Sequence, residues 1–81
     1  MKISYKPTGV CSKQINIEVD DNNIVQDVEY IGGCNGNLKG IGSLVKGMKV
    51  EEVIERLKNI KCGYKNTSCP DQLAKALEEN F

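Results

Sequence analysis

The sequence contains no histidine and no tryptophan, and its only aromatic residues are three tyrosines and one phenylalanine. It also has no net charge, because eleven basic residues balance eleven acidic ones. Proteins that bind nucleic acids usually carry a clearly basic surface, and those that bind single strands also stack bases on aromatic side chains. We therefore expect no nucleic acid among the partners, whereas a small anionic ligand stays compatible with the composition.

Long apolar runs are also missing. The first residues, MKISYKPTG, contain no hydrophobic stretch of the kind found in signal peptides, and nothing later is long enough for a transmembrane helix. We therefore expect a cytoplasmic protein with no membrane partner. In a reducing compartment cysteines serve as metal ligands or reactive thiols more often than as disulfides. Because histidine is absent, the question of site chemistry concerns four cysteines: Cys11, Cys34, Cys62 and Cys69.

The length of the chain limits the number of domains and the size of the hydrophobic core. Eighty-one residues make one domain, spanning residues 1–81. A chain of this size buries only about 60 to 65% of the surface that its unfolded form exposes, so its hydrophobic core is marginal. The sequence therefore favours an additional cross-link.

The N-terminal part has the pattern of β-strands. Apolar and polar residues alternate over residues 13–19, which is typical of a strand with one solvent face. Four turn-forming residues follow at 20–23, and the next run, 24–31, places three larger side chains on one face, namely Ile24, Val28 and Tyr30. The two runs predict a β-hairpin. Residues 1–6 predict a short edge strand, which Pro7 and Gly9 end.

The C-terminal part has the periodicity of helices. Apolar residues recur near helical spacing at Leu38, Ile41, Leu44, Val45 and Met48. Gly40 and Gly42 each weaken this helix by about 1 kcal/mol relative to alanine, so we expect it to depend on tertiary packing. A second stripe, formed by Val50, Val53, Ile54, Leu57 and Ile60, predicts a helix that ends near Cys62 and Gly63.

The last helix has the most distinct start. Ser68 and Asp71 fit a capping pair, and Pro70 fits the first turn, where its missing N–H costs nothing. Its inward stripe is expected to consist of Leu73, Ala74, Leu77 and Phe81. Strands followed by helices predict an α+β fold in which the helices pack on one face of a small antiparallel sheet.

All four cysteines fall at the ends of predicted elements. Cys11 precedes the first hairpin strand and Cys34 follows the second, so the two should lie at the same end of the sheet. Cys62 is expected to close a helix and Cys69 to open the next, with a short loop between them. Two pairs that converge from two places commonly build a tetrahedral thiolate site, in which Zn²⁺ binds four sulfurs at about 2.3 Å.

The predicted surroundings favour thiolates at these positions. Cys34 and Cys69 lie close to predicted helix N-termini, where free N–H groups favour a thiolate over a thiol. Three lysines near the cysteines in sequence, Lys13, Lys61 and Lys65, offset the negative charge of four thiolates on one divalent ion. Inert packing is the competing interpretation, because free cysteine is among the most buried residue types. A redox dithiol of Cys62 with Cys69 and a [2Fe–2S] centre on the same sulfurs also stay open.

Two segments resemble a known family. TSCPDQLAKAL, residues 67–77, is similar to the signature of the TSCPD domain family, and GGCNGNLKGIGSLVKGMKVEEVIERL, residues 32–57, also looks like that family. The resemblance implies a small stand-alone protein with four cysteines. Related domains form the C-terminal part of adenosylcobalamin-dependent ribonucleotide reductases, so the small proteins are often labelled as ribonucleoside-diphosphate reductases.

The order of the motifs is also similar, more distantly, to the NifU-type iron–sulfur cluster scaffold. In that family three cysteines bind zinc or assemble a [2Fe–2S] cluster, and the resemblance carries them over to Cys11, Cys34 and Cys69. Two positions depart from the scaffold: Lys13 stands where the scaffold has an aspartate implicated in cluster release, and Ser68 where it frequently has a histidine. Cys62 supplies a fourth sulfur. These departures imply a closed, structural site that has lost cluster delivery.

The resemblances imply an accessory role and not an enzyme. Ribonucleotide reduction needs a radical-generating cofactor, a substrate cavity and a thiyl-bearing loop, normally on a barrel several times this length. We therefore expect a small protein with zinc bound to Cys11, Cys34, Cys62 and Cys69, which assists a ribonucleotide reductase or another protein partner. The alternative is a thiol redox protein or a protein that binds a [2Fe–2S] cluster. The sequence leaves the oligomeric state open.

Overall fold

In residues 1–33 and 35–81, which the computed structural model describes, three antiparallel strands form one sheet and three helices follow them. The strands are β1 (Lys2–Tyr5), β2 (Ser12–Val19) and β3 (Val25–Gly32), and they pair in the order β1-β2-β3. The helices are α1 (Asn35–Val45), α2 (Val50–Leu57) and α3 (Cys69–Asn80). The predicted α+β class and the predicted edge strand and hairpin are confirmed.

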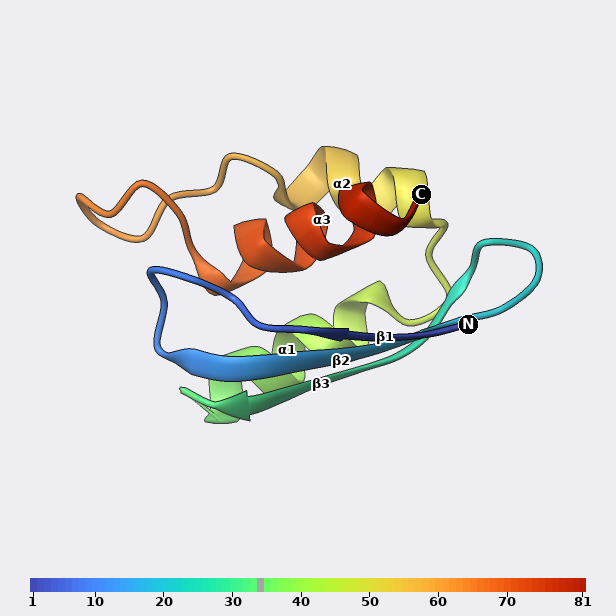
Figure 1. Cartoon of the computed structure of the whole chain (residues 1–81), viewed down its shortest axis with the longest axis horizontal. Helices are drawn as coiled ribbons and strands as arrows, with labels where there is room; N and C mark the ends of the chain where they lie inside the picture. The colour runs from blue at the N-terminus through green and yellow to red at the C-terminus, as the bar shows by residue number, and fades with distance from the viewer. Residues whose placement is uncertain (34) are drawn as a thin grey trace.

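Helices α2 and α3 pack against each other on one side of the sheet, and α1 lies along β3 (Figure 1). The buried apolar residues of all these elements form one core. Three alternate residues of β2, Ile15, Ile17 and Val19, are buried against the helices, as their period-two pattern predicts. Leu73 and Leu77 of α3 are fully buried opposite them. None of the helices in the described part of the chain is long and apolar enough to cross a membrane.

A β-bulge changes which side chains of β3 enter the core. The register shifts next to the pair Val19–Val25, which leaves Gln26 as an extra residue on β3. Such a bulge reverses the alternation of side chains along its strand. Val25 is therefore fully buried, whereas Ile24 is only partly buried. The expectation that Ile24 begins the inward face was wrong.

Helix α2 ends earlier than its apolar stripe predicts. Its last residue is Leu57, and Asn59 follows with a left-handed φ of 67°, a conformation that asparagine tolerates better than most residues. The Asn59 N–H donates to the carboxylate of Asp71 on α3, at 2.7 Å, a tertiary contact that no local pattern reveals. Ile60 is consequently 42% exposed, and Cys62 lies in a loop and not at the end of a helix.

Two apolar residues expected to face inward do not. Leu44 is 78% exposed, because neighbouring residues on a helix point about 100° apart and Val45 takes the core position. Phe81 is 48% exposed, because it follows the last residue of α3 and is not held on the inward face of that helix.

Helix α1 lies directly against the backbone of β3. A Cβ atom on Gly42 would lie 2.8 Å from the carbonyl oxygen of Val28, whereas one on Gly40 would meet nothing within 4 Å. Glycine at position 42 therefore allows the close approach of helix and strand. Packing against β3 offsets the low helix propensity of this segment, as the sequence predicts.

These two glycines provide a matched pair of substitutions in one helix. Gly40→Ala should raise the free energy of unfolding by about 1 kcal/mol, because alanine has the higher helix propensity and no neighbour is disturbed. Gly42→Ala should lower it by about 1 to 3 kcal/mol, because the new methyl group pushes α1 away from β3. Urea unfolding monitored by circular dichroism measures both. Stabilisation by both substitutions would contradict the observed contact.

Candidate metal centre

Four cysteine-bearing segments gather at one end of the sheet. Figure 1 shows the β1–β2 turn, the end of β3, the start of α1 and the loop before α3 at the end of the molecule opposite the two termini. Ser12, the first residue of β2, pairs with Gly32, the last residue of β3. The chain beside Cys11 and the chain just before Cys34 therefore lie at the same level of the sheet. Cys34 itself lies outside the described residues.

Cys11 lies against the backbone that leads to Cys34. Its side chain is exposed. A Cβ atom on Gly33 would lie 3.3 Å from the Cys11 sulfur and 3.3 Å from the backbone nitrogen of Ser12. The sulfur of Cys11 and the residue before Cys34 are thus in close proximity.

A second β-bulge brings Cys69 to the same place. The register of β2 shifts between Ser12 and Gln14, which leaves Lys13 as an extra, exposed residue. The bulge turns Ser12 toward the helices, where it is buried. The Ser12 hydroxyl lies 3.3 Å from the sulfur of Cys69, which is also buried. The neighbour of Cys11 in the sequence therefore contacts Cys69 directly.

The predicted start of α3 is confirmed. Ser68 is the N-cap, and its hydroxyl oxygen accepts a hydrogen bond from the Asp71 N–H at 3.1 Å. The same hydroxyl donates to the carbonyl of Ile60 at 2.6 Å, which ties the loop after α2 to the helix. Cys69 is the first residue of the helix, and Pro70 lies in its first turn.

Tyr30 holds the backbone of Cys69 from the side of the sheet. Its hydroxyl donates to the Cys69 carbonyl at 3.0 Å. Burial raises the pKa of the Tyr30 hydroxyl well above its ordinary 10.0, and the proximity of Cys69 raises this pKa further. Tyr30 therefore remains a neutral hydrogen-bond donor at physiological pH. Its role was not visible from the sequence, because it depends on the packing of β3 against α3.

Cys62 lies in the loop that leads to Cys69. Its N–H donates to the carbonyl of Thr67 at 3.2 Å, and its own carbonyl accepts from the Lys65 N–H at 3.0 Å. These bonds hold the backbone of Cys62 beside a residue only two positions before Cys69. The Cys62 side chain is exposed.

Asp71 anchors this loop to α3. Its buried carboxylate accepts from the Asn59 N–H at 2.7 Å and from the Thr67 hydroxyl at 2.5 Å, and it pairs with Lys75 at 3.4 Å. Burial alone would raise the pKa of Asp71, but these hydrogen bonds and Lys75 outweigh burial and lower it below its ordinary 3.8. The sequence revealed only the capping relation of Asp71 to Ser68, although the short spacing of Thr67, Ser68 and Asp71 is a usable signal.

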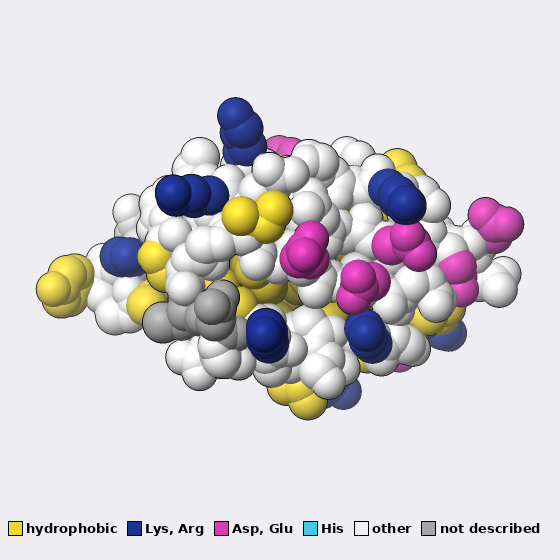
Figure 2. Space-filling model, turned by 90° about the horizontal axis from the view of Figure 1, so that it is seen from below, with side chains coloured by type: hydrophobic (Ala, Val, Ile, Leu, Met, Phe, Trp, Pro, Cys, Tyr) yellow, Lys and Arg dark blue, Asp and Glu magenta, His cyan; other side chains and the backbone are white. Residues whose placement is uncertain are grey.

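The cysteine-bearing end is basic. Segments 6–13, 31–33, 35–37 and 59–67 contain no aspartate or glutamate, but they contain four exposed lysines, namely Lys6, Lys13, Lys61 and Lys65. None of the four forms an ion pair with a described residue. In Figure 2 the cysteine-bearing end is on the left, where basic side chains lie without acidic neighbours. At the opposite end of the same face, basic and acidic side chains are mixed. The charge distribution suits a site that concentrates negative charge.

The three described thiols do not form a ligand set by themselves. Cys11, Cys62 and Cys69 are free, and across residues 1–33 and 35–81 no three cysteine, aspartate or glutamate side chains lie close enough together to hold a metal ion. Cys11 and Cys62 are exposed and can turn about their χ1 bonds, whereas Cys69 is fixed against Ser12. A metal centre at this end of the sheet therefore requires Cys34 as a further ligand. It also requires the exposed side chains of Cys11 and Cys62 to rotate.

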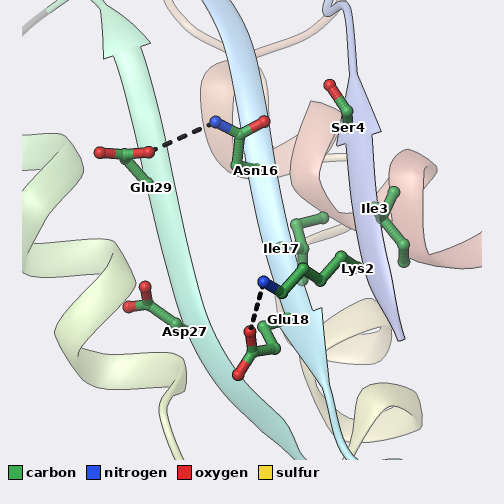
Figure 3. Close-up of a pocket in the computed structure, with 8 residues that line it drawn as sticks. All are labelled: Lys2, Ile3, Ser4, Asn16, Ile17, Glu18, Asp27 and Glu29. Atoms are coloured by element: carbon green, nitrogen blue, oxygen red, sulfur yellow. Dashed lines mark hydrogen bonds and ion pairs between the residues drawn. The ribbon is translucent and has the colours of Figure 1, made fainter.

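Polar side chains also gather on the outer face of the sheet. Figure 3 shows Lys2 paired with Glu18, at 3.8 Å, and the Asn16 amide donating to Glu29, at 3.3 Å, on the face that the helices leave open. Such exposed pairs contribute little to stability or binding. No buried polar side-chain atom in the described part of the chain lacks a hydrogen-bond partner. We interpret this face as ordinary solvated surface.

The substitution Asp71→Asn tests the anchor of the loop. It should lower the free energy of unfolding at pH 7 by about 1.5 to 3 kcal/mol, because hydrogen bonds to a charged carboxylate are lost. The folded pKa of Asp71 is lowered, so its contribution is complete above the ordinary value of 3.8 and is lost as the pH falls through and below that value.

Urea unfolding from pH 7 down to the acid range measures this difference. The gap between wild type and Asp71→Asn should close at low pH, and a gap independent of pH would contradict the assignment. Asp27→Asn is the matched control, because Asp27 is an exposed carboxylate that pairs with an exposed lysine, Lys46. It should have little effect at any pH.

Comparison with known proteins gives one positive result. The family profile described as the TSCPD domain matches residues 2–81, almost the entire chain. Searches of curated proteins and of solved structures returned no match to the chain.

Proposed function

Because the chain belongs to the TSCPD domain family, we propose that it is a small metal-binding accessory protein of the cytoplasm, associated with ribonucleotide reduction and the synthesis of DNA precursors. The proposed ligands are Cys11, Cys34, Cys62 and Cys69, and the proposed metal is zinc. With four protein ligands and no open position, the ion would have a structural role.

The observation that carries this proposal is the meeting of separate segments at one end of the sheet. Ser12, next to Cys11, contacts Cys69, while the sulfur of Cys11 lies against Gly33. The backbone of Cys62 is held to Thr67. Thiolates are soft ligands that select zinc or iron–sulfur clusters, so the donor set fits the group.

A metal at this end would supply the cross-link that a short chain needs. In the sequence Cys11 and Cys34 flank the β2–β3 hairpin, whereas Cys62 lies in the loop after α2 and Cys69 begins α3. A shared ion would join the sheet to the helices where the hydrophobic core ends. Binding energy of this kind adds directly to folding energy in small metal-binding domains.

The surrounding charge also supports the proposal. Four thiolates and one Zn²⁺ leave a net charge of −2, and the exposed lysines of this end, Lys13, Lys61 and Lys65 among them, offset it. The N-terminus of α3 adds partial positive charge beside Cys69. In the resemblance to the NifU-type iron–sulfur cluster scaffold, Lys13 stands at the position of an aspartate that is implicated in cluster release. Cluster release is therefore not part of the proposed function.

The proposed role in ribonucleotide reduction is assistance to a reductase. The reaction is normally built on a barrel several times longer than 81 residues, so we propose no reductase activity for the chain itself. The partner is a ribonucleotide reductase, or another protein of the same process, and the metal would keep the cysteine-bearing end in one shape for docking.

The proposed binding of zinc is tested on protein purified without oxygen. Elemental analysis should find one zinc per chain in a colourless solution. Cys62→Ser should weaken zinc binding by more than the roughly 10- to 100-fold that is typical of changes outside the ligand shell, because it removes a ligand. Asn66→Ser, in the same exposed loop, is the matched control and should bind zinc as the wild type does.

Other outcomes favour the alternatives. Brown protein with iron and sulfide would support a [2Fe–2S] centre on the same sulfurs. A chain with no bound metal whose four thiols titrate as free would overturn the proposal, and a Cys62–Cys69 disulfide that forms and breaks reversibly would then identify a thiol redox protein.

The proposed binding to a ribonucleotide reductase is tested by affinity capture, with the zinc-loaded protein immobilised on a column. A ribonucleotide reductase should bind to the column that carries the wild-type protein. Less of it should bind to a column that carries Cys62→Ser. Equal retention on both columns would show that the metal-bound end is not the docking element, and no retention of a reductase on either would remove that partner.

A further inference from the structure

Gln72 is a buried polar residue whose side chain joins two separate loops. It follows the capping segment of α3 and is only 2% exposed. Its side-chain oxygen accepts a hydrogen bond from the Thr8 N–H at 3.1 Å, and its side-chain nitrogen donates to the Thr67 hydroxyl at 2.9 Å. Both ends of the amide are therefore used, each by a different part of the chain.

Each of the two loops carries one of the proposed ligands, Cys11 or Cys62. Thr8 lies in the turn between β1 and β2, three residues before Cys11. Thr67 lies in the loop that contains Cys62, whose N–H donates to the Thr67 carbonyl. The loops also touch directly, since a Cβ atom on Gly9 would lie 3.3 Å from the methyl carbon of Thr67.

The direction of each hydrogen bond is fixed by its neighbours. The Thr67 hydroxyl has one proton, and it donates that proton to the Asp71 carboxylate, which can only accept. Thr67 must therefore accept from Gln72. The Thr8 N–H can only donate, so the other end of the Gln72 side chain must accept. An amide satisfies both requirements, whereas a carboxylate or an apolar side chain of the same size does not.

A buried amide is costly unless each of its polar atoms is paired, so its presence among apolar core residues calls for a physical reason. The adjacent residues of α3, Leu73 and Ala74, are both fully buried and apolar. A leucine at position 72 would satisfy packing alone. The feature that leucine could not reproduce is the link between the turn before Cys11 and the loop of Cys62.

We propose that Gln72 is a positioning residue of the metal centre, which sets the spacing between the Cys11 turn and the loop that carries Cys62. This inference rests on the four-cysteine site proposed above. A tetrahedral ion requires sulfurs from both loops at defined distances, and Gln72 is the side chain that spans the two. Residues beyond the ligands that orient a metal site typically change its affinity by about 10- to 100-fold when they are replaced.

Two substitutions at this position separate hydrogen bonding from packing. Gln72→Leu removes both hydrogen bonds and leaves an apolar side chain of similar size. Gln72→Glu keeps the acceptor toward Thr8 but places a carboxylate oxygen against the Thr67 oxygen. Both should weaken zinc binding, measured by competition with a chelator, by about 10- to 100-fold.

The matched control is Val19→Ala. Val19 is equally buried but lies at the opposite end of β2, so this substitution weakens the core without touching either loop. Its zinc affinity should stay within about twofold of the wild-type value, because distant sites act independently. All variants are compared after circular dichroism shows that they are folded.

A second readout distinguishes positioning from a general loss of stability. Cobalt(II) bound in place of zinc gives an absorption spectrum that reports the number and arrangement of sulfur ligands. The Gln72 variants should show an altered cobalt spectrum, whereas Val19→Ala should show the wild-type spectrum at a lower free energy of unfolding.

The outcomes separate this inference from the proposed function. If wild-type protein binds zinc but both Gln72 variants bind it as tightly and give the wild-type cobalt spectrum, the inference is overturned and the metal site stands. If the wild type binds neither zinc nor cobalt, the proposed function fails, and the inference fails with it.

Discussion

The register of the β2–β3 ladder at its open end is the constraint on which the rest of the molecule depends. Ser12 pairs with Gly32, and the extra residue Lys13 turns the Ser12 side chain toward the helices. The hydroxyl of Ser12 then reaches the sulfur of Cys69 at 3.3 Å. A shift of one residue would turn Ser12 to solvent and separate the hairpin from the start of α3. Proximity of the cysteine-bearing segments therefore follows from backbone pairing.

The first turn of α3 completes the arrangement from the other layer. Ser68 caps the helix and also binds the Ile60 carbonyl, while Asp71 holds Asn59 and Thr67. These contacts explain why a long, exposed loop keeps a defined course without a hydrophobic core beneath it. Each such hydrogen bond contributes only about 0.5 to 3 kcal/mol, but together they fix the path of the chain on which Cys62 lies.

Much of the fold was predictable from local pattern, and the failures share one cause. The alternation in residues 13–19 and the capping residues of α3 indicated their elements correctly, because both signals are local. The end of α2 was missed because it depends on Asp71, which is distant in the sequence. The core position of Val25 was missed because a bulge reverses the alternation without leaving a residue pattern that announces it.

The candidate site shows the same division between local and tertiary information. The sequence placed the cysteines at the ends of elements, which holds for Cys11 and Cys69, whereas Cys62 lies within a loop. The residues around the thiols were not predictable, because Ser12 and Tyr30 look like ordinary strand residues until β3 and α3 are packed together.

X-ray absorption at the zinc edge, on protein purified without oxygen, tests the central claim most directly. The account predicts a first shell of four sulfur atoms at about 2.3 Å, with no nitrogen or oxygen ligand. A shell that contains oxygen or nitrogen in place of one or more sulfurs, or the absence of any bound zinc, would contradict the claim that the four cysteines meet on one ion.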